Sequence, residues 1–171
     1  YHFLGGIMKH AEALSAITNP TVNSYKRINA PRTTSGATWA PNSVTWTGNN
    51  RTHMVRVPGK GRFELRLPDG AANPYLLQAV IIAAGLDGIR SKADPGKRLD
   101  IDKNQLGLTV KDAQRLPINN QDALRNLDAD TSLKAALGEE FANAYIKLKT
   151  SEWNSFASHL TQWERDHTLD C

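Results

Sequence analysis

Apolar and charged positions alternate along RFELRL, residues 62–67, and this alternation predicts a short strand with two unlike faces. The apolar face carries Phe63, Leu65 and Leu67, and the charged face carries Arg62, Glu64 and Arg66. Turn residues at Pro68-Asp69-Gly70 end the strand. We expect the apolar face to lie on a core. The charged face is either an ordinary solvated surface or part of a functional site.

Helical spacing of apolar residues marks the first element of the chain. The recurring residues are Phe3, Ile7, Ala11 and Leu14. Asn19-Pro20 ends this helix, because a proline cannot continue it. Residues 21–36 are rich in Asn, Thr, Ser and Pro, and we predict a long loop with a functional role there.

Two more strands are predicted before residues 62–67. Residues 37–48 hold tryptophan and valine among threonine and serine, which favours a strand. Residues 52–58 form the next strand, and Gly59-Lys60-Gly61 joins it to residues 62–67 as a β-hairpin.

Helices dominate the rest of the chain. Asn73 caps a helix that starts at Pro74, and its body LLQAVIIAAGL is apolar almost all round, so we expect it to be buried between layers. The remaining predicted segments are a surface excursion over residues 91–117 and helices over residues 121–127, 132–137 and about 139–166.

The element order predicts an α+β fold, in which an antiparallel sheet carries helices packed on one side. The other face of such a sheet can hold a site. We expect one partial catalytic domain over residues 1–171, with site strands, loops and a buried helix in residues 1–90, the excursion in 91–117 and C-terminal helices in 118–171.

Charge and composition narrow the class of protein. The net charge is +4 and the pI is about 9.3, which favours anionic partners. The single cysteine, Cys171, excludes an intrachain disulfide and fits a cytoplasmic protein. The apolar run at residues 76–86 is too short to cross a bilayer, so no membrane partner is expected. The chain starts at Tyr1 without a lead-in, and we interpret it as a piece of a longer protein.

Basic residues gather in the first 70 positions. No aspartate or glutamate occurs between Glu12 and Glu64. The basic residues include Arg27, Arg32, Arg51, Arg56, Lys60, Arg62 and Arg66. A nucleic-acid surface would use such arginines on phosphates, but Glu64 would repel a phosphate backbone and no aromatic ribbon accompanies it. A phosphoryl-transfer pocket uses both groups, because a carboxylate binds Mg²⁺ and arginines neutralise the transferred phosphoryl group.

Four segments in order strengthen the second interpretation. They resemble the second half of the glutamine synthetase catalytic domain, and their sequences resemble a bacterial type III branch more than the type I enzymes. The segments are NPTVNSYKR (19–27), NNRTHMVRVP (49–58), RFELRLPDGAANPYL (62–76) and AAGLDGI (83–89). The resemblance implies an ATP-dependent glutamate–ammonia ligase that uses glutamate, ATP and ammonium, requires Mg²⁺ or Mn²⁺, and has active sites between subunits of a homo-oligomeric ring. It implies no nucleic-acid partner, and a basic nucleic-acid-binding module is the alternative outside enzymes.

The same resemblance implies a role for individual residues. Glu64 matches a metal ligand, and Arg27 and Arg66 match arginines that hold glutamate. The residues implied around the ATP phosphates and the phosphoryl group are Arg51, Arg56 and Arg62. Arg51 and Arg66 are thus the implied catalytic residues. The histidines lack metal-ligand spacing, and we interpret each as a surface or packing residue.

One position departs from the family pattern. The family's flap has a glutamate before Ala-Pro. In this chain Trp39 stands there in Trp39-Ala40-Pro41, and the earlier Asn29-Ala30-Pro31 offers an asparagine instead, so the carboxylate is absent from both positions. A tryptophan cannot accept a proton from ammonium, so an alternative is a γ-glutamyl amide ligase that uses another small amine, such as methylamine. The family's other metal ligands lie before the matched region, so residues 1–171 alone are predicted to be inactive.

Overall fold

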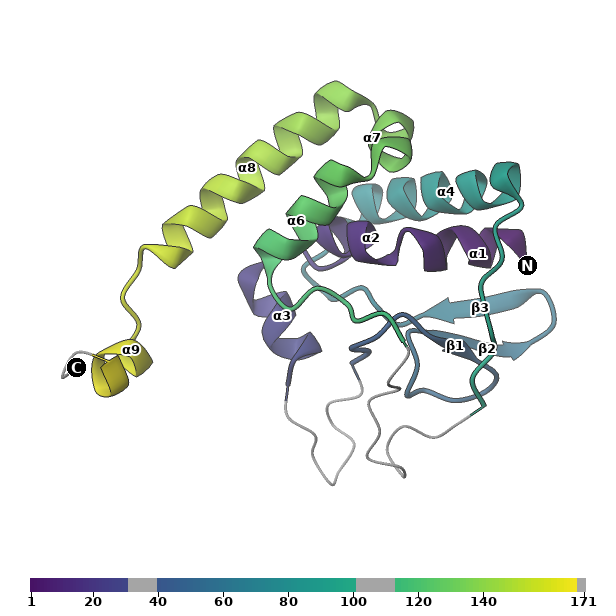
Figure 1. Cartoon of the computed structure of the whole chain (residues 1–171), viewed down its shortest axis with the longest axis horizontal. Coiled ribbons are helices and arrows are strands. Elements are labelled where there is room, and N and C mark those ends of the chain that lie inside the picture. Colours follow the sequence, from purple (N-terminus) through teal and green to yellow (C-terminus); the bar gives the residue numbers. More distant parts are fainter. Residues whose placement is uncertain (31–39, 101–112, 169–171) are drawn as a thin grey trace.

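The computed structural model describes residues 1–30, 40–100 and 113–168, and in it helices cover one face of a small sheet (Figure 1). The helices are α1 (His2–Lys9), α2 (Ala11–Thr18), α3 (Val22–Ile28), α4 (Pro74–Ser91), α6 (Asn120–Ala129), α7 (Thr131–Leu137), α8 (Glu139–Ala157) and α9 (Gln162–Thr168). The strands are β1 (Trp46–Thr47), β2 (Val55–Gly59) and β3 (Arg62–Leu65).

The predicted hairpin is confirmed. β2 and β3 pair antiparallel, with Arg56 opposite Glu64, and Gly61 in the turn has a φ of +77° that favours glycine. Pro58 has no N–H for the ladder, and the register shifts between Arg56 and Gly59 as in a β-bulge. β1 is shorter than residues 37–48 and pairs parallel with β2. The three-stranded sheet is therefore mixed, and the prediction of an antiparallel sheet holds only for the β2–β3 pair.

The apolar face of the sheet lies under α1 and α2. Phe3 of α1 meets Phe63 of β3 with ring centroids 6.0 Å apart. Leu67, just beyond β3, is fully buried, as the alternating pattern predicted. Fully buried side chains of the same cluster come from both layers and include Ile7, Leu14, Ile17, Met54 and Val55. The expected arrangement, with helices on one side of a sheet, is therefore confirmed.

Segments on either side of residues 101–112 run beside the sheet. The N–H of Leu99 donates to the carbonyl of Trp46, and the indole N–H of Trp46 donates to the carbonyl of Gly96 at 3.0 Å. On the C-terminal side of residues 101–112, Leu116 is buried and its N–H donates to the carbonyl of Asn42. The described ends of the predicted surface excursion thus hydrogen-bond to the strand region.

Three helix assignments differ from the sequence prediction. The first predicted helix is divided into α1 and α2 at His10, α3 lies inside the predicted loop, and the predicted helix over residues 139–166 is divided into α8 and α9. The starts of α3 and α9 carry reciprocal side-chain caps. Thr21 and Ser24 form one capping box at α3, and Thr161 and Glu164 exchange the corresponding bonds at α9.

Helix α4 buries one face only. Val80, Ala84, Gly85 and Gly88 are buried against the rest of the chain. The opposite face exposes Tyr75, Ile82, Leu86 and Ile89, so within this chain α4 is not buried all round as its composition predicted. Among the described helices, none is long and apolar enough to cross a membrane.

Close contact between α1 and α4 depends on glycine. A Cβ added at Gly88 would lie 2.3 Å from the carbonyl oxygen of His2 and 2.4 Å from the backbone nitrogen of Gly6. A Cβ at Gly6 would lie 2.0 Å from the carbonyl oxygen of Ala84. These are backbone atoms, so neither clash is relieved by a side-chain rotation. The two helices can approach this closely only without side chains at the crossing.

We expect Gly88→Ala to lower the free energy of unfolding by about 2–3 kcal/mol, because overpacking outweighs the better helix propensity of alanine. Urea unfolding of residues 1–171 measures this change. Gly70→Ala is the matched control, because a Cβ there has nothing within 4 Å. Equal stability of the two variants would contradict the close packing of α1 on α4.

Candidate functional site

Glu64 is the centre of a charged cluster on the sheet. Arg56 Nη1 lies 2.6 Å from Glu64 Oε2, and Arg66 Nη1 lies 2.6 Å from Glu64 Oε1. The Glu64 side chain is 40% exposed, whereas both arginine side chains are 18% exposed. The cluster is therefore open to solvent at the carboxylate and partly enclosed at the guanidinium groups.

The hairpin explains why these residues meet. Arg56 and Glu64 are paired across β2 and β3, which places their side chains on the same face. The Nε and Nη2 atoms of Arg56 both donate to Asn49 Oδ1 in the segment between β1 and β2. Asn49 thus fixes the guanidinium from behind. The sequence analysis did not identify Asn49 as a site residue. Asn49 is followed by a second asparagine, Asn50, and nothing in the sequence distinguishes the one that binds Arg56.

The charge state of Glu64 follows from these contacts. Hydrogen bonds from Arg56 and then from Arg66 hold the pKa of Glu64 below its usual value. The carboxylate is therefore ionised at neutral pH. Two arginines around one carboxylate also leave the cluster with a net positive charge, which suits an anionic ligand.

Arg27 joins the site from a different element. It lies in α3, and its Nη2 donates to the carbonyl oxygen of Leu67 at 2.5 Å. Burial lowers the pKa of Arg27; Asp69 opposes this shift, and the positive charge of Arg66 adds to it. The Nε of Arg27 is buried and has no hydrogen-bond partner among the described residues. Arg27 and Arg66 are thus two neighbouring cations.

The other residues implied by the family resemblance lie further out. Arg51 is exposed in the turn before β2, as its spacing from Arg56 indicated. Arg62 is exposed beside the hairpin turn, at the opposite end of β3 from Arg66. The structure does not bring Arg51 or Arg62 into the ion pairs of Glu64. Trp39 lies outside the described residues.

The described residues contain no group of three or more His, Cys, Asp or Glu side chains that could hold a metal ion. Glu64 is an exposed, ionised carboxylate, which is the type of oxygen ligand that Mg²⁺ prefers. Glu64 therefore fits as one ligand of a site whose other ligands come from elsewhere. Its two arginine partners would have to share the carboxylate with the metal.

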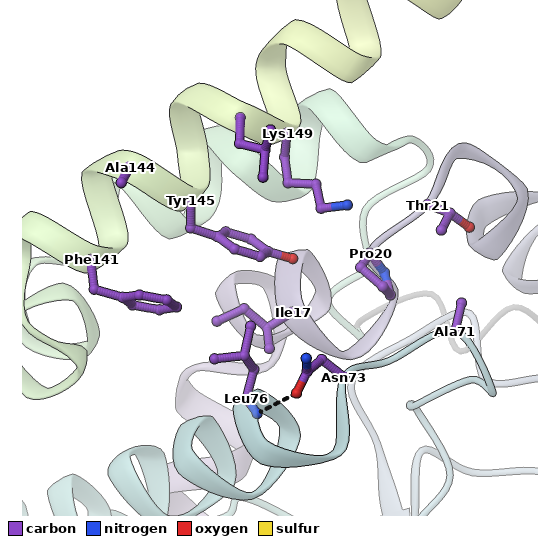
Figure 2. A pocket seen from close by; sticks show the side chains of 11 residues that line it. Ile17, Pro20, Thr21, Ala71, Asn73, Leu76, Phe141, Ala144, Tyr145 and Lys149 are labelled. Atoms are coloured by element: carbon purple, nitrogen blue, oxygen red, sulfur yellow. Dashed lines mark hydrogen bonds between the residues drawn. The ribbon is translucent and has the colours of Figure 1, made fainter.

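A separate apolar cavity of about 460 Å³ lies between α8 and the ends of α2 and α4 (Figure 2). Phe141 and Tyr145 reach across from α8 toward Ile17 and Leu76. The Tyr145 hydroxyl donates to the carbonyl of Ala16 at 2.8 Å and anchors α8 on α2. None of the arginines discussed above lines this cavity, so it is distinct from the charged cluster.

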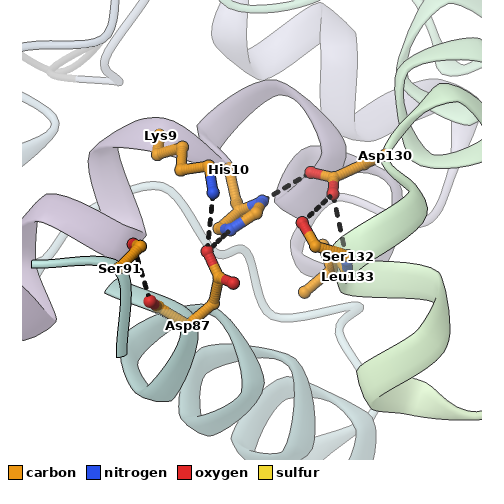
Figure 3. Close-up of polar contacts among 7 residues, drawn as sticks. All are labelled: Lys9, His10, Asp87, Ser91, Asp130, Ser132 and Leu133. Carbon is orange, nitrogen blue, oxygen red and sulfur yellow. Dashed lines mark hydrogen bonds and ion pairs between the residues drawn. The ribbon is translucent and has the colours of Figure 1, made fainter. Parts of the chain in front are cut away.

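A second charged cluster lies at the junction of α1 and α2 (Figure 3). His10 is buried, with Nδ1 at 2.5 Å from Asp130 Oδ2 and Nε2 at 2.9 Å from Asp87 Oδ2. Lys9 Nζ also lies 2.7 Å from Asp87 Oδ2. The interpretation of His10 as a packing residue rather than a metal ligand agrees with this burial. The cluster ties three helical regions together and has no contact with Glu64.

The family model described as "Glutamine synthetase, catalytic domain" matches residues 1–168. The chain belongs to the glutamine synthetase family. The resemblance noted in four segments of the sequence is thereby confirmed. The finer assignment to a bacterial type III branch stays a prediction.

Curated relatives support the same membership. The chain is 77% identical over 168 residues to a glutamine synthetase of Rhizobium leguminosarum bv. phaseoli and 72% identical over 169 residues to one of Rhizobium meliloti. It is 42% identical over 173 residues to a glutamate–methylamine ligase of Methyloversatilis universalis. These matches cover 98–99% of the chain and 39% of each relative. The chain thus spans about two fifths of the length of these relatives.

Two solved structures share the fold over the whole chain. A structure described as "GmaS/ADP complex-Conformation 1" superposes with a TM-score of 0.91 at 61% identity. The match covers 100% of this chain and 39% of the chain in that structure. A structure described as "Apo GmaS without ligand" gives a TM-score of 0.89 at 57% identity, covering 100% and 38%. The helix-rich arrangement with a small sheet therefore matches solved relatives.

Proposed function

We propose that this chain is the C-terminal part of an ATP-dependent glutamate–ammonia ligase and supplies the arginine and carboxylate groups of its site. The observation that carries the proposal is the Arg56–Glu64–Arg66 cluster, in which one ionised carboxylate sits between two guanidinium groups. High identity to two Rhizobium glutamine synthetases supports the reaction class.

The reaction would proceed in two balanced steps. A γ-carboxylate oxygen of glutamate attacks the terminal phosphorus of ATP, and the bond from that phosphorus to ADP breaks. The amine nitrogen then attacks the carbonyl carbon of γ-glutamyl phosphate, phosphate leaves, and the nitrogen loses a proton. In both steps negative charge moves at the phosphoryl group, so fixed guanidinium groups lower the barrier by neutralising that charge.

Each residue has a role in this proposal. Arg27 and Arg66, the two neighbouring cations beside Leu67, would hold the carboxylates of glutamate. Arg51, Arg56 and Arg62 would contact the phosphates of ATP, and Arg51 and Arg66 would act on the transferred group. A relative solved as a complex with ADP supports a nucleotide site in this family.

Glu64 would bind a Mg²⁺ or Mn²⁺ ion. When bound, such an ion would neutralise phosphate charge beyond what the arginines supply. Glu64 is suited to this because Arg56 and Arg66 keep it ionised while its side chain stays 40% exposed. The arginines also set the direction in which its carboxylate points.

We further propose the setting in which the chain works. The division into residues 1–90 with the site, 91–117 and 118–171 describes one partial catalytic domain. The complete enzyme would form a homo-oligomeric ring in the cytoplasm, with each site completed by residues outside this chain. For that reason residues 1–171 alone should not form an amide from glutamate, ATP and ammonium.

A second candidate is a γ-glutamyl amide ligase that uses methylamine. Two observations favour it: the glutamate–methylamine ligase of Methyloversatilis universalis is 42% identical, and Trp39 stands where the family's flap carries a glutamate. An indole ring can pack against a methylammonium ion through apolar and cation–π contact, which favours the alkylated amine. The indole cannot accept the proton that either amine must lose, so that proton would go to a carboxylate elsewhere in the complete site.

A chimera tests the function. Residues 1–171 replace the matching segment of the Rhizobium leguminosarum glutamine synthetase, and kcat/KM is measured for ammonium and for methylamine. We expect ATP- and glutamate-dependent amide formation by the chimera and no turnover by residues 1–171 alone. An inactive chimera that folds and assembles like the parent enzyme would overturn the proposal.

The same assay decides between the two amines. If Trp39 forms the amine wall, Trp39→Glu should shift the kcat/KM ratio of ammonium to methylamine toward ammonium by about ten-fold. Trp153→Glu is the control, because Trp153 lies on α8 next to Phe156 and away from the charged cluster. A strong preference for ammonium that Trp39→Ala leaves unchanged would rule out the methylamine alternative.

A further inference from the structure

Asn19 is a fully buried polar residue at the end of α2 with both ends of its amide engaged. Its Oδ1 accepts a hydrogen bond from Thr18 Oγ1 at 2.7 Å, and its Nδ2 donates to the carbonyl oxygen of Leu67 at 3.0 Å. The Thr18 hydroxyl therefore fixes which way the amide faces. A buried amide so oriented is costly to rotate, because rotation would leave polar atoms unpaired.

The carbonyl of Leu67 is shared between two donors. Asn19 Nδ2 and Arg27 Nη2 both donate to it, and a carbonyl oxygen has two lone pairs to accept them. The backbone on either side is also fastened. The N–H of Asp69 donates to the carbonyl of Thr18, and the N–H of Arg66 donates to the carbonyl of Met54. Leu67 thus lies between Arg66 and a segment attached to the end of α2.

Arg27 carries unused hydrogen-bonding capacity at this point. Its Nε is buried without a partner among the described residues, and its charge is close enough to that of Arg66 for the two to repel. Asp69 and Glu64 offset part of this repulsion, and an anionic ligand between the two guanidinium groups would offset more of it. The bond to Leu67 holds Arg27 in place against that repulsion.

We propose that Asn19, oriented by Thr18, is a positioning residue: it fixes the Leu67 carbonyl and through it the guanidinium group of Arg27 beside Arg66, in the geometry that receives a substrate carboxylate. This inference rests on the proposed function, because it takes Arg27 and Arg66 as the glutamate-binding pair. The alternative is that Asn19 only ends α2 and stabilises the fold.

A double-mutant cycle in the chimera separates these two roles. Asn19→Ser removes the donor to Leu67, Arg27→Ala removes the guanidinium group, and the two changes are then combined. We expect Asn19→Ser to raise KM for glutamate about ten-fold, because the Leu67 carbonyl that holds the Arg27 guanidinium group loses its hydrogen bond from Asn19. KM for ATP should change less than about two-fold. In the Arg27→Ala background the same change should have almost no further effect.

Tyr145→Phe is the control for a purely structural role. It removes another buried hydrogen bond to α2, from the Tyr145 hydroxyl to the carbonyl of Ala16, which involves neither Leu67 nor Arg27. It should lower stability without raising KM for glutamate. If Asn19→Ser does not fold, Thr18→Val serves instead, because it removes only the hydroxyl that orients the Asn19 amide.

The outcomes separate this inference from the proposed function. If Arg27→Ala leaves KM for glutamate unchanged, the proposed role of Arg27 in glutamate binding is wrong. If Arg27→Ala raises KM but the effect of Asn19→Ser is independent of Arg27, or raises KM for ATP equally, then Asn19 is not a positioning residue. Coupling confined to glutamate supports the inference.

Discussion

Glu64→Gln should lower kcat of the chimera about 100- to 1,000-fold at saturating Mg²⁺, because a neutral amide cannot replace a charged metal ligand that stabilises transferred charge. The substitution keeps the shape of the side chain. Because Glu64 is 40% exposed and its ion pairs lie near the surface, we expect the free energy of unfolding of residues 1–171 to change by less than about 1 kcal/mol.

Glu152→Gln is the matched control for this experiment. Glu152 is also a partly exposed carboxylate in an ion pair, 2.8 Å from Lys149 on α8, away from the cluster. Its removal should leave kcat unchanged. Near-normal turnover of Glu64→Gln would sink the assignment of Glu64 to the site.

Glu64 has a second possible role besides metal binding. Glu64 could act only by orienting Arg56 and Arg66, to which its two oxygens are bound. The Mg²⁺ dependence of the rate distinguishes the two. Loss of a metal ligand should raise the Mg²⁺ concentration that gives half-maximal rate, whereas loss of orientation alone should lower kcat at an unchanged Mg²⁺ requirement.

The alternating pattern of residues 62–67 was informative because a strand has a fixed period. It correctly predicted the hairpin, the burial of Leu67 and the shared face of Glu64 and Arg66. Local periodicity says nothing about which distant element covers that face. The contact of Arg27 with Leu67 joins residues 40 positions apart and depends on α3, a helix that composition alone described as a loop.

Some missed features did carry a sequence signal. Thr161-Gln162-Trp163-Glu164 has the spacing of a capping box, and it marks the start of α9 within a predicted continuous helix.

The exposed face of α4 differs from the prediction for another reason. Its composition suits a helix buried all round, and within this chain no described segment covers Tyr75 or Ile82. Propensity and pattern describe what a helix can bury, whereas tertiary contacts decide what it does bury.

The buried cluster around His10 could not be predicted either, because its partners lie 77 and 120 positions away. Both ring nitrogens face carboxylate oxygens, an arrangement that favours the doubly protonated imidazolium form of the ring. We expect His10→Gln to lower the free energy of unfolding by about 3 kcal/mol near pH 6, because Asp87 and Asp130 then lose a buried cationic partner.

The pH dependence of that loss has a definite sign. Burial lowers the pKa of His10, but hydrogen bonds to Asp130 and then Asp87 outweigh burial and leave the pKa raised. Its contribution is therefore complete below the unfolded value of about 6.5 and disappears as pH rises through the higher folded pKa. The pKa values of Asp87 and Asp130 are lowered, so their contribution is present above about pH 4 and disappears as pH falls further.

Urea unfolding of residues 1–171 at several pH values measures this dependence. The stability difference between wild type and His10→Gln should be largest between about pH 4 and 6.5 and should shrink as the pH rises toward 9. Other charged groups around His10 are Lys9 and Glu12. Lys9→Met is the control: Lys9 also contacts Asp87, but it is 48% exposed, so its removal should cost less than about 1 kcal/mol and less than the loss of His10 at every pH tested. A difference for His10→Gln that stays constant or grows with pH would show that the ring is neutral in the folded chain, and the three helical regions would then be joined by ordinary hydrogen bonds rather than by a buried cation.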